Sequence, residues 1–327
     1  MSSLLHHSSP FSPRRPWWGG DLQTLRNYAL QARKALPLPH HDSERLVIPL
    51  GDGSGDHMVV ALSRPARSHG RPLVVLIHGI AGSENSCYMT VAAAYFMARN
   101  YPVLRVNLRG AGLSRPFCRK QYHAGSSEDL AAVIAGLDPE LTRHGLLPIG
   151  FSLGGNILLK LLGTAGSHLP IIKAASVSAP IDLAQSSKSL QRWRNFGYHR
   201  FILTRLKRQC TAAGAQLTDD ERHAIRGARS LWELDERFTA PRNGYAGAAD
   251  YYHDNASQAY LGGIRQPTML IHAKDDPFVP VGPYLQQRWS GQPHLNVLLP
   301  ASGGHLGFHD PLGLWHLRQI DSFFAAA

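Results

Sequence analysis

The most informative part of the 327-residue chain is Leu146-Leu147-Pro148-Ile149-Gly150-Phe151-Ser152-Leu153-Gly154-Gly155-Asn156. Its apolar start, its serine between glycines and its Ile/Leu-rich continuation predict a strand, a sharp turn and a helix, the arrangement of a nucleophile elbow. A side chain at Gly150 or Gly154 would collide with the strand and helix that meet there. The helix would direct its positive end at the turn, where an oxyanion develops during acyl transfer. The pentapeptide alone is weak, because a chain with 31 glycines can form it as a surface turn.

The elbow predicts that an acid and then a histidine follow at the ends of later strands. The apolar run Pro267–Ala273 is followed by Asp275 and Asp276, and the run Leu295–Leu299 is followed by His305. Residues just past the carboxyl ends of strands are where open α/β sheets bind their ligands. The sequence leaves both acids open. We prefer Asp276, because the Pro-Phe-Val-Pro after it is typical of the loop that follows the acid in hydrolases, and Asp275 would brace the turn.

Donors for the oxyanion are expected upstream. Leu73–Ile77 is the most strand-like segment, and it continues into His78-Gly79-Ile80-Ala81-Gly82-Ser83, whose backbone N–H groups could turn inward. We assign the oxyanion hole to the backbone N–H groups of Ile80 and Leu153. An ordinary turn between a strand and a helix is the alternative for this loop.

The alternation of strands and helices predicts an α/β fold with a mainly parallel sheet. Residues 46–48 and 58–62 read as an opening antiparallel pair. Residues 182–254 contain no convincing strand, and we expect them to form a helical cap insertion that covers Ser152. The core would then comprise residues 43–181 and 255–327, with residues 1–42 as an extension packing on it. Arg109 and Asp129 are expected to pair as structural support, with His123 nearby.

Composition fits a globular enzyme, with 43% hydrophobic residues. No apolar run reaches the roughly 18 residues of a membrane span, and residues 1–10 lack the pattern of a secretory signal. The three cysteines are odd in number and widely spaced, which fits a reducing compartment, so a cytoplasmic location is expected. The chemistry requires no metal or other cofactor, and the chain has no Walker loop or dinucleotide fingerprint.

The net charge of +11 is partly concentrated in residues 192–208. Phe201-Ile202-Leu203 and Leu206 could form one apolar helical face there, beside several arginines. A solvated helix surface is the favoured interpretation, and contact with an anionic phospholipid surface is the alternative. No nucleic-acid motif is present, and the oligomeric state is left open.

Several further segments carry a resemblance to a known family; they are Trp18–Leu25, Asn107–Ser114, Tyr122–Asp129, Tyr251-Tyr252 and Ile264–Phe278. Together with the elbow they resemble the YheT-like group, the AB hydrolase 4 family, of the α/β-hydrolase superfamily, which is related to the mammalian alpha/beta-hydrolase-domain lipases. The resemblance extends from Pro16 to the last helix and implies an eight-stranded, mostly parallel sheet flanked by helices. It also implies a triad of Ser152, Asp276 and His305. The chain departs from the group at Asp21, where histidine is more common.

These observations predict a serine esterase acting on a small-molecule ester with a short- to medium-chain acyl group, monoacylglycerol-like substrates included. One alternative is an acyltransferase with the same triad, since His305 and Asp310 also spell His-x4-Asp. Partition of the acyl-enzyme between water and added alcohol separates the two. A non-catalytic binder on the same fold is the third class, which failure of Ser152 to react with a fluorophosphonate would support.

Overall fold

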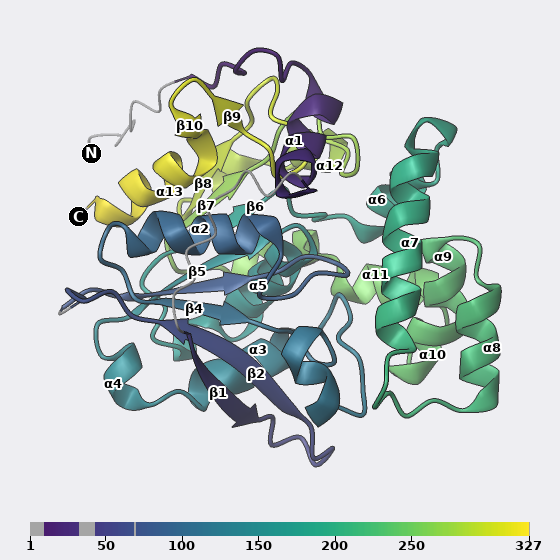
Figure 1. Ribbon diagram of the computed structural model, residues 1–327. Coiled ribbons are helices and arrows are strands. Elements are labelled where there is room, and N and C mark those ends of the chain that lie inside the picture. The colour runs from purple at the N-terminus through teal and green to yellow at the C-terminus, as the bar shows by residue number, and fades with distance from the viewer. Residues whose placement is uncertain (1–9, 33–42, 69, 327) are drawn as a thin grey trace.

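The centre of the fold is an eight-stranded sheet, seen in a computed structural model that describes residues 10–32, 43–68 and 70–326 (Figure 1). The strands lie in the order β1-β2-β4-β3-β5-β6-β7-β8. From β4 to β8 all neighbours are parallel, whereas β2 pairs antiparallel with both β1 and β4. The strands are β1 (Glu44–Pro49), β2 (His57–Ser63), β3 (Leu73–Ile77), β4 (Val103–Val106), β5 (Leu146–Phe151), β6 (Ala174–Val177), β7 (Thr268–Ile271) and β8 (Leu295–Leu298). The expected α/β architecture is confirmed.

Helices cover both faces of this sheet. Val74 and Leu76 of β3 belong to the apolar cluster that includes α2 (Cys87–Met97) and α13 (Trp315–Ala325). The alternate residues of β3 belong to the cluster that includes α3 (Ser127–Ala135) and α5 (Leu153–Thr164). Because both faces of the central strands are buried, these strands read in the sequence as continuous apolar runs.

Several further elements outside residues 182–254 are short. They include α4 (Pro139–Thr142), α12 (Gly282–Gln286) and the paired β9 (His309–Asp310) and β10 (Gly313–Leu314). Before β6, Ile171 makes a single isolated bridge to Leu146. Helix α3 ends at Ala135, just before Gly136.

Residues 182–254 connect β6 to β7 and contain helices and no strand. The helices are α6 (Leu183–Leu190), α7 (Phe196–Cys210), α8 (Asp219–Gly227), α9 (Leu231–Leu234), a π-helix over Asp235–Thr239, α10 (Ala240–Arg242) and α11 (Ala248–Asn255). Figure 1 shows α7 to α10 grouped at one side of the sheet. The segment has its own apolar cluster, which includes Leu203, Leu206 and Leu234. Ile80 and Phe278, which lie outside the segment, pack against this cluster.

The buried side of α7 differs from the predicted apolar face at one residue. Ile202, Leu203 and Leu206 are buried as that face requires, but Phe201 is 47% exposed. Positions 202 and 206 are four residues apart and lie on the same side of the helix, whereas 201 lies about 100° around it from 202. The apolar stripe is therefore narrower than predicted, and an aromatic ring is left on the surface.

The N-terminal helix α1 (Gly20–Ala32) is hydrogen-bonded to the C-terminal part of the chain. The Gln23 side chain donates to the carbonyl of His309 and accepts from its backbone N–H, at 3.1 and 2.7 Å. The Thr24 hydroxyl accepts from the backbone N–H of His305 at 2.8 Å. The expected packing of residues 1–42 on the core can be followed for 10–32 only, since 1–9 and 33–42 lie outside the described residues.

Within the described residues, no helix combines the length and the apolar character needed to cross a bilayer. All three cysteines lie in the described part of the chain, where they are buried thiols.

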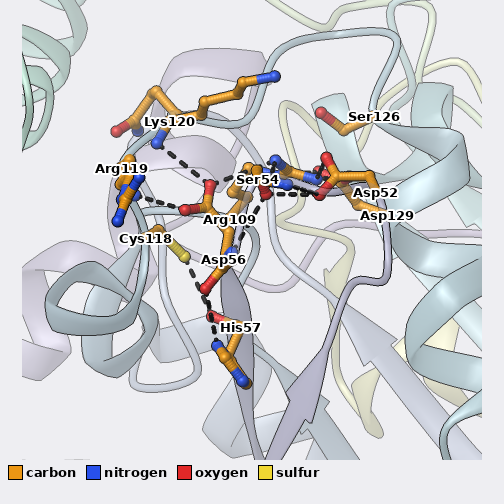
Figure 2. Close-up of polar contacts among 12 residues, drawn as sticks. Asp52, Ser54, Asp56, His57, Arg109, Cys118, Arg119, Lys120, Ser126 and Asp129 are labelled. Carbon is orange, nitrogen blue, oxygen red and sulfur yellow. Dashed lines mark hydrogen bonds and ion pairs between the residues drawn. The ribbon is translucent and has the colours of Figure 1, made fainter.

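A buried arginine ties the β1–β2 turn to α3, as Figure 2 shows. Arg109 donates to both carboxylate oxygens of Asp129 at 3.0 and 2.6 Å, to Asp56 at 3.2 Å and to Asp52 at 2.8 Å. The side chains of Arg109 and Asp56 are 6% and 0% exposed, so these charges depend on one another for compensation. The expected pairing of Arg109 with Asp129 is present, and two further acids join it.

The Arg109 cluster also supports the loop after β3. The carbonyl of Arg109 accepts from the backbone N–H of Tyr122 at 2.8 Å. The Tyr122 hydroxyl in turn accepts from the backbone N–H of Ala81 at 2.7 Å. A chain of hydrogen bonds therefore runs from the buried ion pair to the loop that carries Ile80.

We expect Arg109→Leu to lower the free energy of unfolding by about 3–5 kcal/mol, because Asp56 and Asp129 would remain buried without a cation. Urea denaturation measures this loss. Arg143→Ala is the matched control, since its ion pair with Glu140 is more than half exposed on both sides and should contribute less than about 0.5 kcal/mol. Equal losses in the two variants would contradict the importance of the buried cluster.

Candidate active site

Ser152 lies between the end of β5 and the start of α5, in a strained backbone conformation. Its φ of 52° and ψ of −123° fall in a region that residues other than glycine rarely occupy. Its backbone N–H donates to the carbonyl of Val177 at 2.9 Å, and its own carbonyl accepts from Gly155 at 2.8 Å. These bonds hold the turn in place.

Close backbone contact explains the glycines around Ser152. A Cβ atom on Gly150 would lie 2.5 Å from the carbonyl oxygen of Gly154. A Cβ atom on Gly154 would lie 2.5 Å from the carbonyl oxygen of His78. Any side chain at these two positions would push α5 away from the sheet, so the elbow requires glycine at both.

His305, in the loop after β8, contacts both other residues of the predicted triad. Its Nε2 lies 3.0 Å from Ser152 Oγ, and its Nδ1 lies 2.8 Å from Asp276 Oδ2. With the proton on Nδ1 shared with Asp276, Nε2 is left to accept from the serine hydroxyl. The Phe278 ring lies against the imidazole, with 4.6 Å between ring centroids.

Asp276 follows β7, and its side chain is fully buried. Its Oδ1 accepts from the backbone N–H groups of Phe278 and Val279 at 2.8 and 3.0 Å. Burial by itself raises the pKa of this carboxyl, but His305 and these hydrogen bonds outweigh it and hold the pKa below its usual value. Asp276 is therefore a carboxylate facing the imidazole.

Asp275, the other acid considered from the sequence, points elsewhere. Its Oδ1 accepts from the backbone N–H of Gly304 at 2.9 Å. It therefore bonds the loop after β7 to the loop that carries His305, as bracing of the turn requires.

The loop after β3 brings Ile80 beside the elbow. The neighbouring backbone N–H groups of Gly79 and Ala81 donate to the hydroxyls of Tyr88 and Tyr122, at 2.9 and 2.7 Å. In contrast, the N–H groups of Ile80 and Leu153 have no acceptor in the part of the chain that the structure describes. Both residues line the cavity that contains Ser152.

A cavity of about 570 Å³ opens in front of Ser152, between the sheet and residues 182–254. Its size is that of a site for a small molecule. Most of its wall is apolar, with Leu183, Leu190, Ile202 and Phe238 from the helical segment. The segment therefore lies on the same side of the sheet as Ser152.

One part of the cavity wall is polar and irregular. The π-helix, a rare element that often occurs at functional sites, carries Asp235 and Thr239 into the wall. Asp235 accepts a hydrogen bond from the Tyr252 hydroxyl at 2.6 Å. Burial raises the pKa of its carboxyl to about 6.

Several residues of this site were not foreseen. Thr24 holds the backbone of His305, Tyr88 and Tyr122 hold the loop after β3, and Asp235 lies in the cavity wall. His272 is also buried beside the triad, 4.0 Å from Asp276 and stacked on Tyr284 with 4.4 Å between ring centroids. Thr24 and Tyr122 lie in segments that carry the family resemblance, and His272 lies at the end of the apolar run before Asp276, whereas Tyr88 and Asp235 had no such sequence signal.

Comparison with known proteins places this geometry in a family. The family model described as alpha/beta hydrolase fold matches residues 72–312. YheT of Escherichia coli (strain K12), named as a candidate esterase, is 32% identical over 92% of this chain and 87% of its own length. The mouse protein Phospholipase ABHD3 is 29% identical over 75% of this chain, which spans 60% of that protein.

A solved structure, the Pyrococcus furiosus esterase Pf2001, is similar in fold, with a TM-score of 0.59 at 14% identity over 96% of this chain and 98% of that one. The strand order, the elbow at Ser152 and the matched family model all indicate the same fold. The chain belongs to the alpha/beta hydrolase family, and within it is a relative of YheT.

Proposed function

We propose that the protein is a serine esterase that cleaves carboxylic esters through an acyl-enzyme on Ser152. The observation that carries this proposal is the continuous hydrogen-bonded chain from Ser152 through His305 to Asp276 at one end of a largely apolar cavity. The esterase and phospholipase names of its relatives support the same class of reaction.

In the proposed mechanism His305 Nε2 removes the proton of Ser152 Oγ as that oxygen attacks the ester carbonyl. Asp276 keeps the imidazole in the required tautomer and stabilises the imidazolium. The N–H groups of Ile80 and Leu153 stabilise the tetrahedral oxyanion, an effect worth a few kcal/mol for each donor. His305 then protonates the leaving alkoxide, and water attacks the acyl-enzyme by the reverse sequence of proton transfers.

We further propose that residues 182–254 act as the cap that shapes the substrate pocket. Their apolar residues line the cavity, and their cluster packs against Ile80, beside the proposed oxyanion hole. The cavity volume and apolar wall fit short- to medium-chain acyl groups, and the polar wall at Asp235 suits a hydroxylated alcohol portion such as that of a monoacylglycerol. A cytoplasmic location belongs to the same proposal, supported by the three thiols.

The acyltransferase alternative is less well supported than hydrolysis. Asp310, the acid of the His-x4-Asp pattern, forms an ion pair with Arg318 and accepts from the backbone N–H of Leu312. His305 pairs with Asp276 instead, so the His-x4-Asp pattern adds no support for transfer.

The first test is a series of p-nitrophenyl esters, from acetyl upward, with the wild type and Ser152→Ala purified alike. We expect the wild type to be active with a maximum at short to medium acyl length, and the variant to lose essentially all activity because it lacks the nucleophile. Added alcohol should divert only a minor part of the product into transfer. Equal hydrolysis by both proteins, or transfer dominating at modest alcohol, would contradict the proposal.

A second test separates the two neighbouring acids. Asp276→Asn should lower kcat by about 10³–10⁴-fold, because the amide no longer holds the imidazole in the working tautomer. Asp275→Asn retains an oxygen that can accept from Gly304 and should lower kcat less than about tenfold. Steady-state kinetics with a single ester decides between them, and a larger loss in Asp275→Asn would show that the acids are misassigned.

A third test concerns Asp235 and the pH dependence of stability. Folding raises the pKa of its carboxyl from the ordinary 3.8 of an exposed aspartate to about 6. The folded state therefore binds this proton more tightly than the unfolded chain does, and stability decreases as pH rises from about 4 to about 6. Asp235→Asn should remove this loss, raising the free energy of unfolding at pH 7.5 by about 3 kcal/mol with little gain at pH 4. Urea denaturation at both pH values measures it, and the same change at both pH values would contradict the assignment.

A further inference from the structure

Two segments that help to line the cavity also carry apolar side chains that face solvent. The structure describes 12 exposed large hydrophobic residues, and half of them come from two short segments. These six, which we call the docking face, are Trp18 just before α1 with Leu22 and Leu25 in it, and Trp193 in the 3₁₀ turn before α7 with Phe196 and Phe201 in α7. Trp193 is 90% exposed and Phe196 is 64% exposed. Such a concentration in a water-exposed region indicates an interaction site.

The two segments form one surface. Asp21 of α1 accepts from Arg194 at 2.9 Å and from the Tyr198 hydroxyl of α7 at 3.0 Å. Leu25 from the first segment and Phe201 from the second both line the cavity that contains Ser152. Leu22 and Leu25 are three residues apart in α1 and lie on the same side of that helix. The docking face therefore borders the entrance to the active site.

The charge around the docking face is mostly positive, and its acid, Asp21, is paired with Arg194. Residues 183–218 contain seven lysines and arginines and no aspartate or glutamate. Arg192, Arg200 and Arg205 are exposed among the aromatic residues. Arg205 lies over the Phe201 ring and Arg15 over the Trp18 ring, with 5.3 and 5.1 Å to the ring centroids. Apolar tips beside long cationic side chains match a surface whose headgroups are anionic and whose interior is apolar.

We propose that this face docks the protein on the surface of an anionic phospholipid bilayer. Trp193 and Phe196 enter the boundary between headgroups and acyl chains, where aromatic side chains are favoured, while the arginines contact the lipid phosphates. The cavity mouth then opens at the bilayer, so an apolar ester reaches Ser152 without crossing water. Docking itself does not depend on the proposed esterase activity, because it uses residues outside the triad.

Co-sedimentation of the purified full chain with vesicles tests this proposal. Phosphatidylcholine vesicles with and without phosphatidylglycerol are compared at low and high salt. We expect binding to the anionic vesicles, weakened by salt because screening reduces the attraction of the arginines. Trp193→Ala/Phe196→Ala should reduce binding by about tenfold or more. Arg192→Gln/Arg200→Gln should reduce binding to the anionic vesicles only.

The matched control removes exposed apolar side chains elsewhere. Leu285→Ala/Leu312→Ala deletes residues that are 60% and 80% exposed and leaves the charge unchanged, so it should bind vesicles like the wild type. Ser152→Ala should also bind, which keeps docking and catalysis distinguishable. Trp193→Ala/Phe196→Ala should still hydrolyse a water-soluble acetyl ester, since neither residue lines the cavity.

Three outcomes would overturn the proposal. The wild type could fail to bind anionic vesicles, or the docking-face and control variants could bind them equally. The third outcome is that Trp193→Ala/Phe196→Ala changes only the self-association of the protein and not its binding to vesicles. Light scattering of the wild type and Trp193→Ala/Phe196→Ala without vesicles detects the last of these, which would identify the face as a contact between two copies of the chain.

Discussion

The close contact of β5 and α5 at Ser152 is the constraint on which the site depends. Backbone atoms of the strand, the helix and the loop after β3 approach so closely that Gly150 and Gly154 leave no room for a Cβ atom. Ser152 is thereby held at a positive φ, and the N–H of Leu153, which has no acceptor among the described residues, lies at the start of α5. The strain is sustained because the elbow lies between buried parallel strands that cannot shift independently.

The other half of the site depends on contacts that are distant in the sequence. The loop of His305 is held by Thr24 from α1 and by Asp275 from the loop after β7. Thr24 lies outside residues 72–312, which match the family model. The N-terminal helix is therefore part of the active-site structure, and through Asp21 it also contacts the helical segment over the cavity.

The features that the sequence predicts are those determined by neighbouring residues in the chain. Ser152, Asp276 and His305 each follow a buried apolar run, so their placement at one edge of the sheet follows from the parallel topology. Thr24 and Asp235 carry no such local signal, because their positions depend on residues more than 200 apart or on an irregular π-helix. Phe201 was placed in an apolar face by composition, and only the packing of α7 shows which side of the helix is buried. The Pro-Phe-Val-Pro after Asp276 favours that acid from the sequence, and in the folded chain Asp276 contacts His305 while Asp275 accepts from Gly304.

The most direct test of the central claim is the site of covalent labelling by a fluorophosphonate, mapped by mass spectrometry of proteolytic peptides. We expect one adduct for each chain, on Ser152. Labelling should be strongly slowed in His305→Ala, because the general base is removed. An adduct on another residue, or labelling of Ser152 that is unaffected by loss of His305, would contradict the account.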